Sequence, residues 1–140
     1  MPLERTQGAS GRVICRIRVA YSETDQMGVV HHASYFCYFE KARMEHFRSH
    51  GCSYVNIEKS GVFLMVIEAD CKFRSPARFD EQIDVTAWVA RLTSHRIVHE
   101  YEVRGEDGRV IAFGRTVIAS VDYSGVPLPL PEHLRLALAI

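Results

Sequence analysis

The segment from His32 to His50 constrains the fold most, because it carries no glycine or proline and is too long for a single strand. Four of its first eight positions are tyrosine or phenylalanine, and mixed charges follow. Apolar groups on every side of a helix indicate burial, and the later charges indicate that the helix emerges toward solvent. Gly51 comes next and is a typical helix stop. We therefore predict one long helix over this segment, buried in its N-terminal half.

Most of the remaining chain shows the two-residue alternation of apolar and polar side chains that is typical of strands. The predicted strands are Val13–Tyr21, Val62–Phe73, Ile83–Ala90, Ile97–Val103 and Val110–Val121. Asp107-Gly108 lies between the last two and is a strong hairpin signal. Cys52–Ser60 is expected to form a short helix or a loop. Pro131–Ile140 is expected to form a short C-terminal helix.

One strand, a long helix and then a run of antiparallel strands predict an α+β fold, in which the sheet wraps around one central helix. The chain has 140 residues and fits one domain, which we expect over residues 12–140. Residues 1–11 are polar and predict a flexible N-terminal arm. Such a sheet leaves open edges, and open edges favour a homo-oligomer.

The charge balance narrows the classes of partner. Because 17 basic side chains stand against 17 acidic ones, the bulk surface gives no reason to expect nucleic acid or an anionic membrane. No apolar run approaches the roughly 20 residues of a membrane span, so integral membrane contact is not expected. The four cysteines form no CxxC pair and no secretory leader is recognisable. These features predict reduced thiols and a cytoplasmic protein.

The loop between the first strand and the long helix holds the residues suited to chemistry. Asp25 and Gly28 fit a plain turn, which requires no function. A helix that begins near His32 also directs unpaired backbone N–H groups toward this loop. A carboxylate that attacks or activates water, together with donors for a developing oxyanion, can carry out acyl transfer. No GxSxG motif occurs, so an activated acyl group such as a thioester suits the site better than an amide.

Three short motifs extend this observation. The first consists of Thr24, Asp25, Gly28, Val29, Val30, His32 and Tyr35. The second is the helix run Phe39-Glu40-Lys41-Ala42-Arg43, and the third consists of Phe73, Pro76, Ala77, Phe79 and Asp80. Over about residues 12–125, the chain with these motifs resembles the 4-hydroxybenzoyl-CoA thioesterase family, in its YbgC-like branch, which has the hot-dog fold.

The resemblance implies a thioesterase that hydrolyses an acyl-CoA thioester to the free acid and coenzyme A, without a metal or other cofactor. Asp25 is then the catalytic carboxylate, as nucleophile or general base. His32 marks the oxyanion site through its backbone N–H, and its imidazole assists. Tyr35 is the neighbouring side chain expected to contact the substrate.

The resemblance also implies where coenzyme A and partner subunits bind. The turn with Arg91, His95 and Arg96 matches the position of the family's phosphate-contacting loop, so these side chains are expected to bind coenzyme A. Arg74 and Arg78 are second choices for that role. The expected assembly is a dimer or a dimer of dimers, that is, a homotetramer. An acyl carrier protein is an alternative carrier of the acyl group.

Other interpretations stay open. A non-catalytic module that binds acyl thioesters or an acyl carrier protein fits every feature except the carboxylate of Asp25. A hot-dog dehydratase handles the same thioesters, but its usual pattern of a histidine and an acid is missing. Glu45 on the helix is an alternative nucleophile. His46 and His50 share a helix face as zinc ligands do, yet no HExxH motif or third ligand accompanies them.

Overall fold

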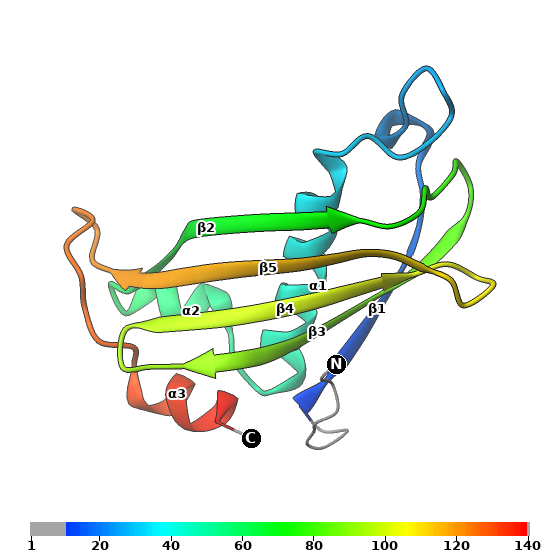
Figure 1. Cartoon of the computed structure of the whole chain (residues 1–140). Coiled ribbons are helices and arrows are strands. Elements are labelled where there is room, and N and C mark those ends of the chain that lie inside the picture. Colours follow the sequence, from blue (N-terminus) through cyan, green and yellow to red (C-terminus); the bar gives the residue numbers. More distant parts are fainter. Residues whose placement is uncertain (1–10, 140) are drawn as a thin grey trace.

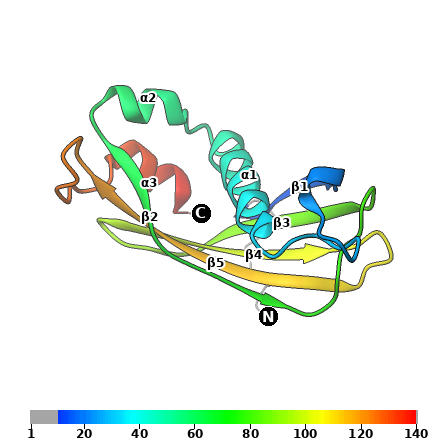
Figure 2. The same cartoon turned by 90° about the horizontal axis from the view of Figure 1, so that it is seen from above.

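Five antiparallel strands form one sheet, and three helices lie on one face of it, in a computed structural model that describes residues 11–139 (Figures 1 and 2). The elements in chain order are β1 (Val13–Arg18), α1 (Ser34–Ser49), α2 (Tyr54–Lys59), β2 (Phe63–Phe73), β3 (Gln82–Leu92), β4 (Arg96–Arg104), β5 (Val110–Val121) and α3 (Glu132–Leu138). The strand order across the sheet is β1-β3-β4-β5-β2. The expected α+β fold, with an antiparallel sheet around one long helix, is confirmed. Most of the expected N-terminal arm, residues 1–10, lies outside the described residues.

The first strand is shorter than the sequence pattern predicted. It ends at Arg18, which pairs with Gln82 at the start of β3. Beyond this pair, Val19 still exchanges backbone hydrogen bonds with Glu81 and Asp80 before the chain leaves the sheet. The chain then forms a single 3-10 turn at Tyr21–Glu23 and enters the loop that precedes α1. The sheet pairing therefore sets the residue at which this loop begins.

The prediction that α1 is buried only in its N-terminal half was wrong. Its buried residues run along the whole helix: Tyr35, Tyr38, Phe39, Ala42, Arg43, His46 and Phe47. Their spacing alternates between three and one, which keeps them on one helix face. Phe36, in the aromatic N-terminal part, is instead 40% exposed. Figure 1 shows the reason, since α1 crosses the strands of the sheet from the side of β2 toward β3 and so packs on the sheet beyond its start.

One ring fixes how α1 sits on the middle of the sheet. Phe39 stacks on Tyr101 of β4 with ring centroids 4.5 Å apart and an interplanar angle of 13°. On β5, a Cβ at Gly114 would overlap the Phe39 ring, so this close approach requires glycine. The pair places α1 across β4 and β5 without a gap.

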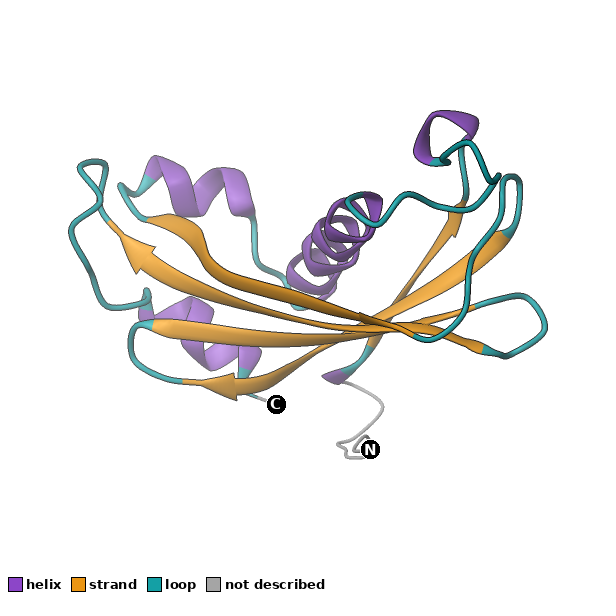
Figure 3. Ribbon diagram, turned by 45° about the horizontal axis from the view of Figure 1, so that its top comes forward, coloured by secondary structure: helices purple, strands orange, loops and turns teal. Residues whose placement is uncertain are grey.

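The two short helices, α2 and α3, cover the end of the sheet that lies away from the start of α1 (Figures 2 and 3). Leu134 and Leu138 of α3 are buried in one apolar cluster with Ile57 of α2 and Ile97 of β4. This second core is separate from the one under the start of α1. Within residues 11–139, no helix is long and apolar enough to cross a membrane.

Candidate active site

The loop from residue 20 to residue 33 folds as a small hairpin with Asp25 in its turn. The Asp25 N–H donates to Val29 O (2.9 Å), and the Gly28 N–H donates to Asp25 O (3.0 Å). The side chain of Asp25 accepts the Met27 N–H at 2.8 Å through Oδ1, while the Val29 N–H lies at 3.4 Å. Gly28 has φ +78°, a backbone conformation that glycine adopts without strain. Asp25 is exposed and its carboxylate is held by its own turn.

The hairpin leads into α1 with one open backbone donor. The N–H groups on either side of His32 are engaged, because that of His31 donates to Glu23 O (2.8 Å) and that of Ala33 to His31 Nδ1 (3.1 Å). The next N–H groups bond back to carbonyls three residues earlier, beginning with Ser34 to His31. Within the described part of the chain, the His32 N–H has no hydrogen-bond partner. The start of α1 therefore presents the backbone N–H of His32 as an open donor.

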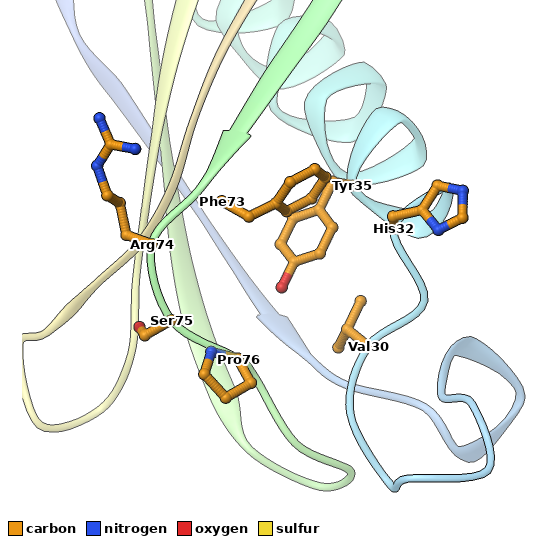
Figure 4. A pocket seen from close by; sticks show the side chains of 7 residues that line it. All are labelled: Val30, His32, Tyr35, Phe73, Arg74, Ser75 and Pro76. Atoms are coloured by element: carbon orange, nitrogen blue, oxygen red, sulfur yellow. The ribbon is translucent and has the colours of Figure 1, made fainter.

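A cavity of about 300 Å³ lies beside this donor, between the start of α1 and the end of β2. Its lining residues, shown in Figure 4, are Val30, His32, Tyr35, Phe73, Arg74, Ser75 and Pro76. Tyr35 and Phe73 meet edge to face with ring centroids 5.3 Å apart. The imidazole of His32 is exposed and stacks on that of His31 at 4.2 Å. The structure thus brings His32 and Tyr35 to one mostly apolar cavity at the hairpin that carries Asp25.

Tyr35 supplies a neutral hydroxyl to this cavity. Burial raises the pKa of Tyr35 to about 12, so the hydroxyl keeps its proton at neutral pH. In Figure 4 the hydroxyl points toward Ser75 and Pro76, whereas the guanidinium of Arg74 points away from the cavity. Arg74, a second choice for coenzyme A binding, lies instead 5.7 Å from the centre of the Phe113 ring.

The predicted phosphate-binding residues belong to the turn between β3 and β4, which lies at the other end of the sheet from the end of β2 (Figure 1). Arg91, His95 and Arg96 are exposed around the turn between β3 and β4. Phe73, at the cavity, is level with Val103 through β5, and Arg96 lies seven residues from Val103 along β4. At about 3.3 Å per residue this separation is roughly 23 Å. One chain does not bring these cations to the cavity.

The wall of the cavity is held by a residue that sequence reasoning missed. Arg109 directly follows the Asp107-Gly108 turn, and its guanidinium donates to both oxygens of Glu81 (2.8 Å each) and to Pro76 O (2.7 Å). The ion pair lowers the pKa of Glu81, chiefly through the Arg109 hydrogen bonds. An arginine after a predicted hairpin turn was a weak signal, because its partners lie about 30 residues earlier in the chain.

The remaining candidates lie away from the hairpin. Glu45, the alternative nucleophile, is exposed near the end of α1 and forms an ion pair with Arg48. His46 is buried, where its Nδ1 faces His99 Nε2 at 3.4 Å, and its ring stacks on His50 at 4.2 Å. Among residues 11–139, no group of three or more His, Cys, Asp or Glu side chains is arranged to hold a metal ion.

Comparison with known proteins places these features in a family. Residues 19–138 match the model of the thioesterase-like superfamily. The putative acyl-CoA thioesterase YneP of Bacillus subtilis is 31% identical over 94 residues, which cover 67% of this chain and 68% of that protein. The acyl-CoA thioester hydrolase YbgC of Escherichia coli is 26% identical over 119 residues, covering 84% of this chain and 89% of that protein.

Solved structures give the same result. A DHNA-CoA thioesterase from Staphylococcus aureus superposes with a TM-score of 0.83 at 30% identity, covering 85% of this chain and 80% of that one. The predicted resemblance to the hot-dog thioesterases is confirmed by these matches.

Proposed function

The chain belongs to the thioesterase-like superfamily and is an acyl-CoA thioester hydrolase, and from this premise we propose that Asp25 is its catalytic carboxylate. The observation that carries the proposal is the position of Asp25. Its hairpin ends at the start of α1, where the His32 N–H is an open donor beside the cavity. An attacking group and an oxyanion donor are the two elements that thioester hydrolysis requires.

The proposed reaction proceeds at the mouth of the cavity. The thioester carbonyl oxygen accepts the His32 N–H, and its carbon faces Asp25. Asp25 either attacks this carbon, forming a mixed anhydride that water then hydrolyses, or removes a proton from the water that attacks the carbon. The carbon–sulfur bond breaks, coenzyme A leaves as the thiol, and water supplies the oxygen of the free acid. In this scheme the hydroxyl of Tyr35 contacts the acyl group, and the imidazole of His32 assists proton transfer.

The test is thiol release from a panel of acyl-CoAs by the wild type and by Asp25→Asn. We expect at least about a hundredfold loss in the variant, the usual size of a general-base contribution. The amide oxygen of asparagine still accepts the Met27 N–H, so the turn is kept. Asp122→Asn is the matched control, because Asp122 Oδ1 accepts the Ser124 N–H in another loop at the same 2.8 Å. Equal rates for wild type and Asp25→Asn would remove Asp25 from the mechanism.

His32→Ala separates the two roles proposed for that residue. Alanine keeps the backbone N–H and loses only the imidazole. We expect a smaller loss than in Asp25→Asn, because the backbone donor does the main stabilisation of the oxyanion. A loss as large as that of Asp25→Asn would instead assign the main role to the side chain.

We further propose a homo-oligomer, as a dimer or a dimer of dimers. β2 is an edge strand whose outer side has no strand partner among the described residues. It carries exposed apolar side chains at Met65, Val66 and Ile67. Long, apolar, unpaired edges favour strand pairing with another chain. In such an assembly, Arg91, His95 and Arg96 of one protomer bind the phosphates of coenzyme A that is held at the cavity of its partner.

A cytoplasmic location is also proposed. All four cysteines are free thiols, and Cys37 is exposed. An exposed free thiol suits a reducing compartment. The acyl group arrives on coenzyme A or on an acyl carrier protein, and the relative rates on the two carriers decide between them.

A further inference from the structure

Glu23 contacts more parts of the active-site hairpin than its exposure suggests. Its carboxylate accepts the Ala20 N–H at 2.9 Å and the Tyr38 hydroxyl at 2.7 Å, both through Oε1. Its backbone carbonyl accepts the His31 N–H at 2.8 Å, and the Ser34 hydroxyl lies at 3.3 Å. Glu23 therefore binds the start of the loop, the residue before His32 and the first residue of α1.

The partner of its carboxylate belongs to the rigid part of the molecule. Tyr38 is fully buried in the core under the start of α1, and its ring meets that of Tyr35 edge to face at 5.7 Å. Burial and the neighbouring carboxylate of Glu23 raise the pKa of Tyr38, so the hydroxyl is the donor and the carboxylate the acceptor. A hydrogen bond between a hydroxyl and a carboxylate is stronger than one between neutral groups.

These contacts form one chain from the core to the open donor. Tyr38 holds the side chain of Glu23, and the carbonyl of Glu23 holds the N–H of His31. The peptide that follows His31 carries the N–H of His32. The direction of that N–H thus depends on where Glu23 is held.

We propose that Glu23 and Tyr38 are positioning residues, which aim the His32 N–H at the thioester carbonyl by fixing the hairpin to the core. The inference rests on the proposed function, because it assigns how the oxyanion donor of that reaction is held. Neither residue touches the substrate in this assignment. A donor that is aimed imperfectly loses much of its effect on the transition state and little of its effect on substrate binding.

The experiment compares four variants of the whole chain on an acyl-CoA that the wild type hydrolyses. Tyr38→Phe and Glu23→Ala remove the two ends of the hydrogen bond, and Glu23→Gln keeps an acceptor for Tyr38. Tyr54→Phe is the matched control, since its half-buried hydroxyl donates to Leu64 O at 3.2 Å, outside the hairpin. We expect kcat to fall between about tenfold and a hundredfold in the first two variants, with KM changed little. Glu23→Gln is expected to stay within about threefold of the wild type, because its amide oxygen replaces the acceptor.

A second readout does not depend on hydrolysis. Amide hydrogen exchange at His31 reports the bond to Glu23 O, and we expect it to accelerate at least about tenfold in Tyr38→Phe and Glu23→Ala but not in Tyr54→Phe. The kcat of the double variant Glu23→Ala/Tyr38→Phe is expected to be no lower than that of the less active single variant, because the two residues act as one unit.

Unchanged exchange at His31, or a loss of kcat no greater than in Tyr54→Phe, overturns the inference while the proposed function stands. If the wild type hydrolyses no acyl-CoA, the proposed function fails, and the exchange at His31 still decides whether Tyr38 holds the hairpin.

Discussion

Asp25 and Asp122 occupy the same position in two copies of one hydrogen-bonded turn. In each copy the carboxylate accepts the N–H two residues later at 2.8 Å, and a glycine three residues later has a positive φ. The aspartate N–H also donates to the carbonyl four residues later in each copy, at 2.9 Å and 2.8 Å. Turn geometry therefore explains the conformation of both residues. What distinguishes Asp25 is that its hairpin leads into α1 at the cavity lined by His32 and Tyr35.

The shared turn predicts equal structural costs. Asp25→Ala and Asp122→Ala each remove one carboxylate acceptor of backbone N–H groups, so each is expected to lower the free energy of unfolding by about 1 kcal/mol, as for a lost helix cap. Thioesterase activity is expected to fall in Asp25→Ala alone. Urea denaturation and thiol-release assays measure the two effects. A large activity loss in Asp122→Ala would contradict this prediction.

The contact between Phe39 and Gly114 predicts a destabilised variant. Gly114→Ala adds a methyl group where the Phe39 ring already lies, and overpacking of this kind costs about 1–3 kcal/mol. Phe39→Leu removes the ring and also destabilises. Because the clash disappears with the ring, the double variant is expected to lose less free energy of unfolding than the two single variants lose together, as measured by urea denaturation. Additive losses would show that the ring moves aside without cost.

Two buried histidines predict a loss of stability in mild acid. Burial lowers the pKa of His46 to about 4, with a smaller contribution from His50, and burial lowers that of the fully buried His99. Arg43 lies in the same buried cluster and also disfavours the charged form of His99. Between pH about 6.5 and about 4 the folded chain binds fewer protons than the unfolded chain, so stability falls as the pH falls through this window.

For His46 alone the loss is about 3 kcal/mol, from about 1.4 kcal/mol per pKa unit. Unfolding measured at a series of pH values should show a shallower slope for His46→Gln than for the wild type. His133→Gln, at an exposed position on α3, serves as the control and should leave the slope unchanged. Parallel slopes for all three proteins would contradict the assignment.

The open edge of β2 predicts an assembly that a single charge disrupts. Ile67 is 40% exposed at a bulge in this edge strand. Ile67→Lys places a charge at the proposed interface and is expected to shift sedimentation toward the monomer. Ile14→Lys, on β1 at the other edge and 61% exposed, is the matched control and should leave the assembly intact. Dissociation by the control instead would move the interface to β1.

The phosphate contacts predict a difference between two substrates. Arg96→Ala is expected to raise KM for an acyl-CoA about tenfold, in line with the loss of one charge-assisted hydrogen bond. KM for the matching acyl-pantetheine, which lacks the nucleotide and its phosphates, should not change. Arg135→Ala, an exposed position on α3, controls for the general loss of positive charge. Equal effects on both substrates would rule out a phosphate contact.

The helix α1 shows how far local sequence patterns reach. Residues 32–50 predicted a long helix, and Ser34–Ser49 is one. The burial of Arg43 and His46 could not be predicted, because it depends on Tyr101 and His99, which lie more than 50 residues later. A local window carries no information on which polar side chains of a helix meet a distant strand.

The candidate site shows the same limit. The Asp-x-x-Gly spacing predicted the turn at Asp25, yet the same spacing occurs at Asp122, and a helix follows each of them. The residues after Asp25 and the cavity at the start of α1 distinguish the two turns. That the His32 N–H is the open donor depends on Glu23, whose carbonyl engages the neighbouring His31. The roles of Asp25 and His32 in catalysis stay predictions until the variants are assayed.

The Phe39 ring against Gly114 also determines what α1 can do as a body. A ring seated against Gly114 and stacked on Tyr101 resists movement of the helix, because the close packing leaves the ring no free space. The start of α1 at the cavity and its buried His46 near the other end are therefore coupled as parts of one rigid helix. Any opening of the active site must then come from movement of the hairpin or of the strand ends, while α1 stays in place.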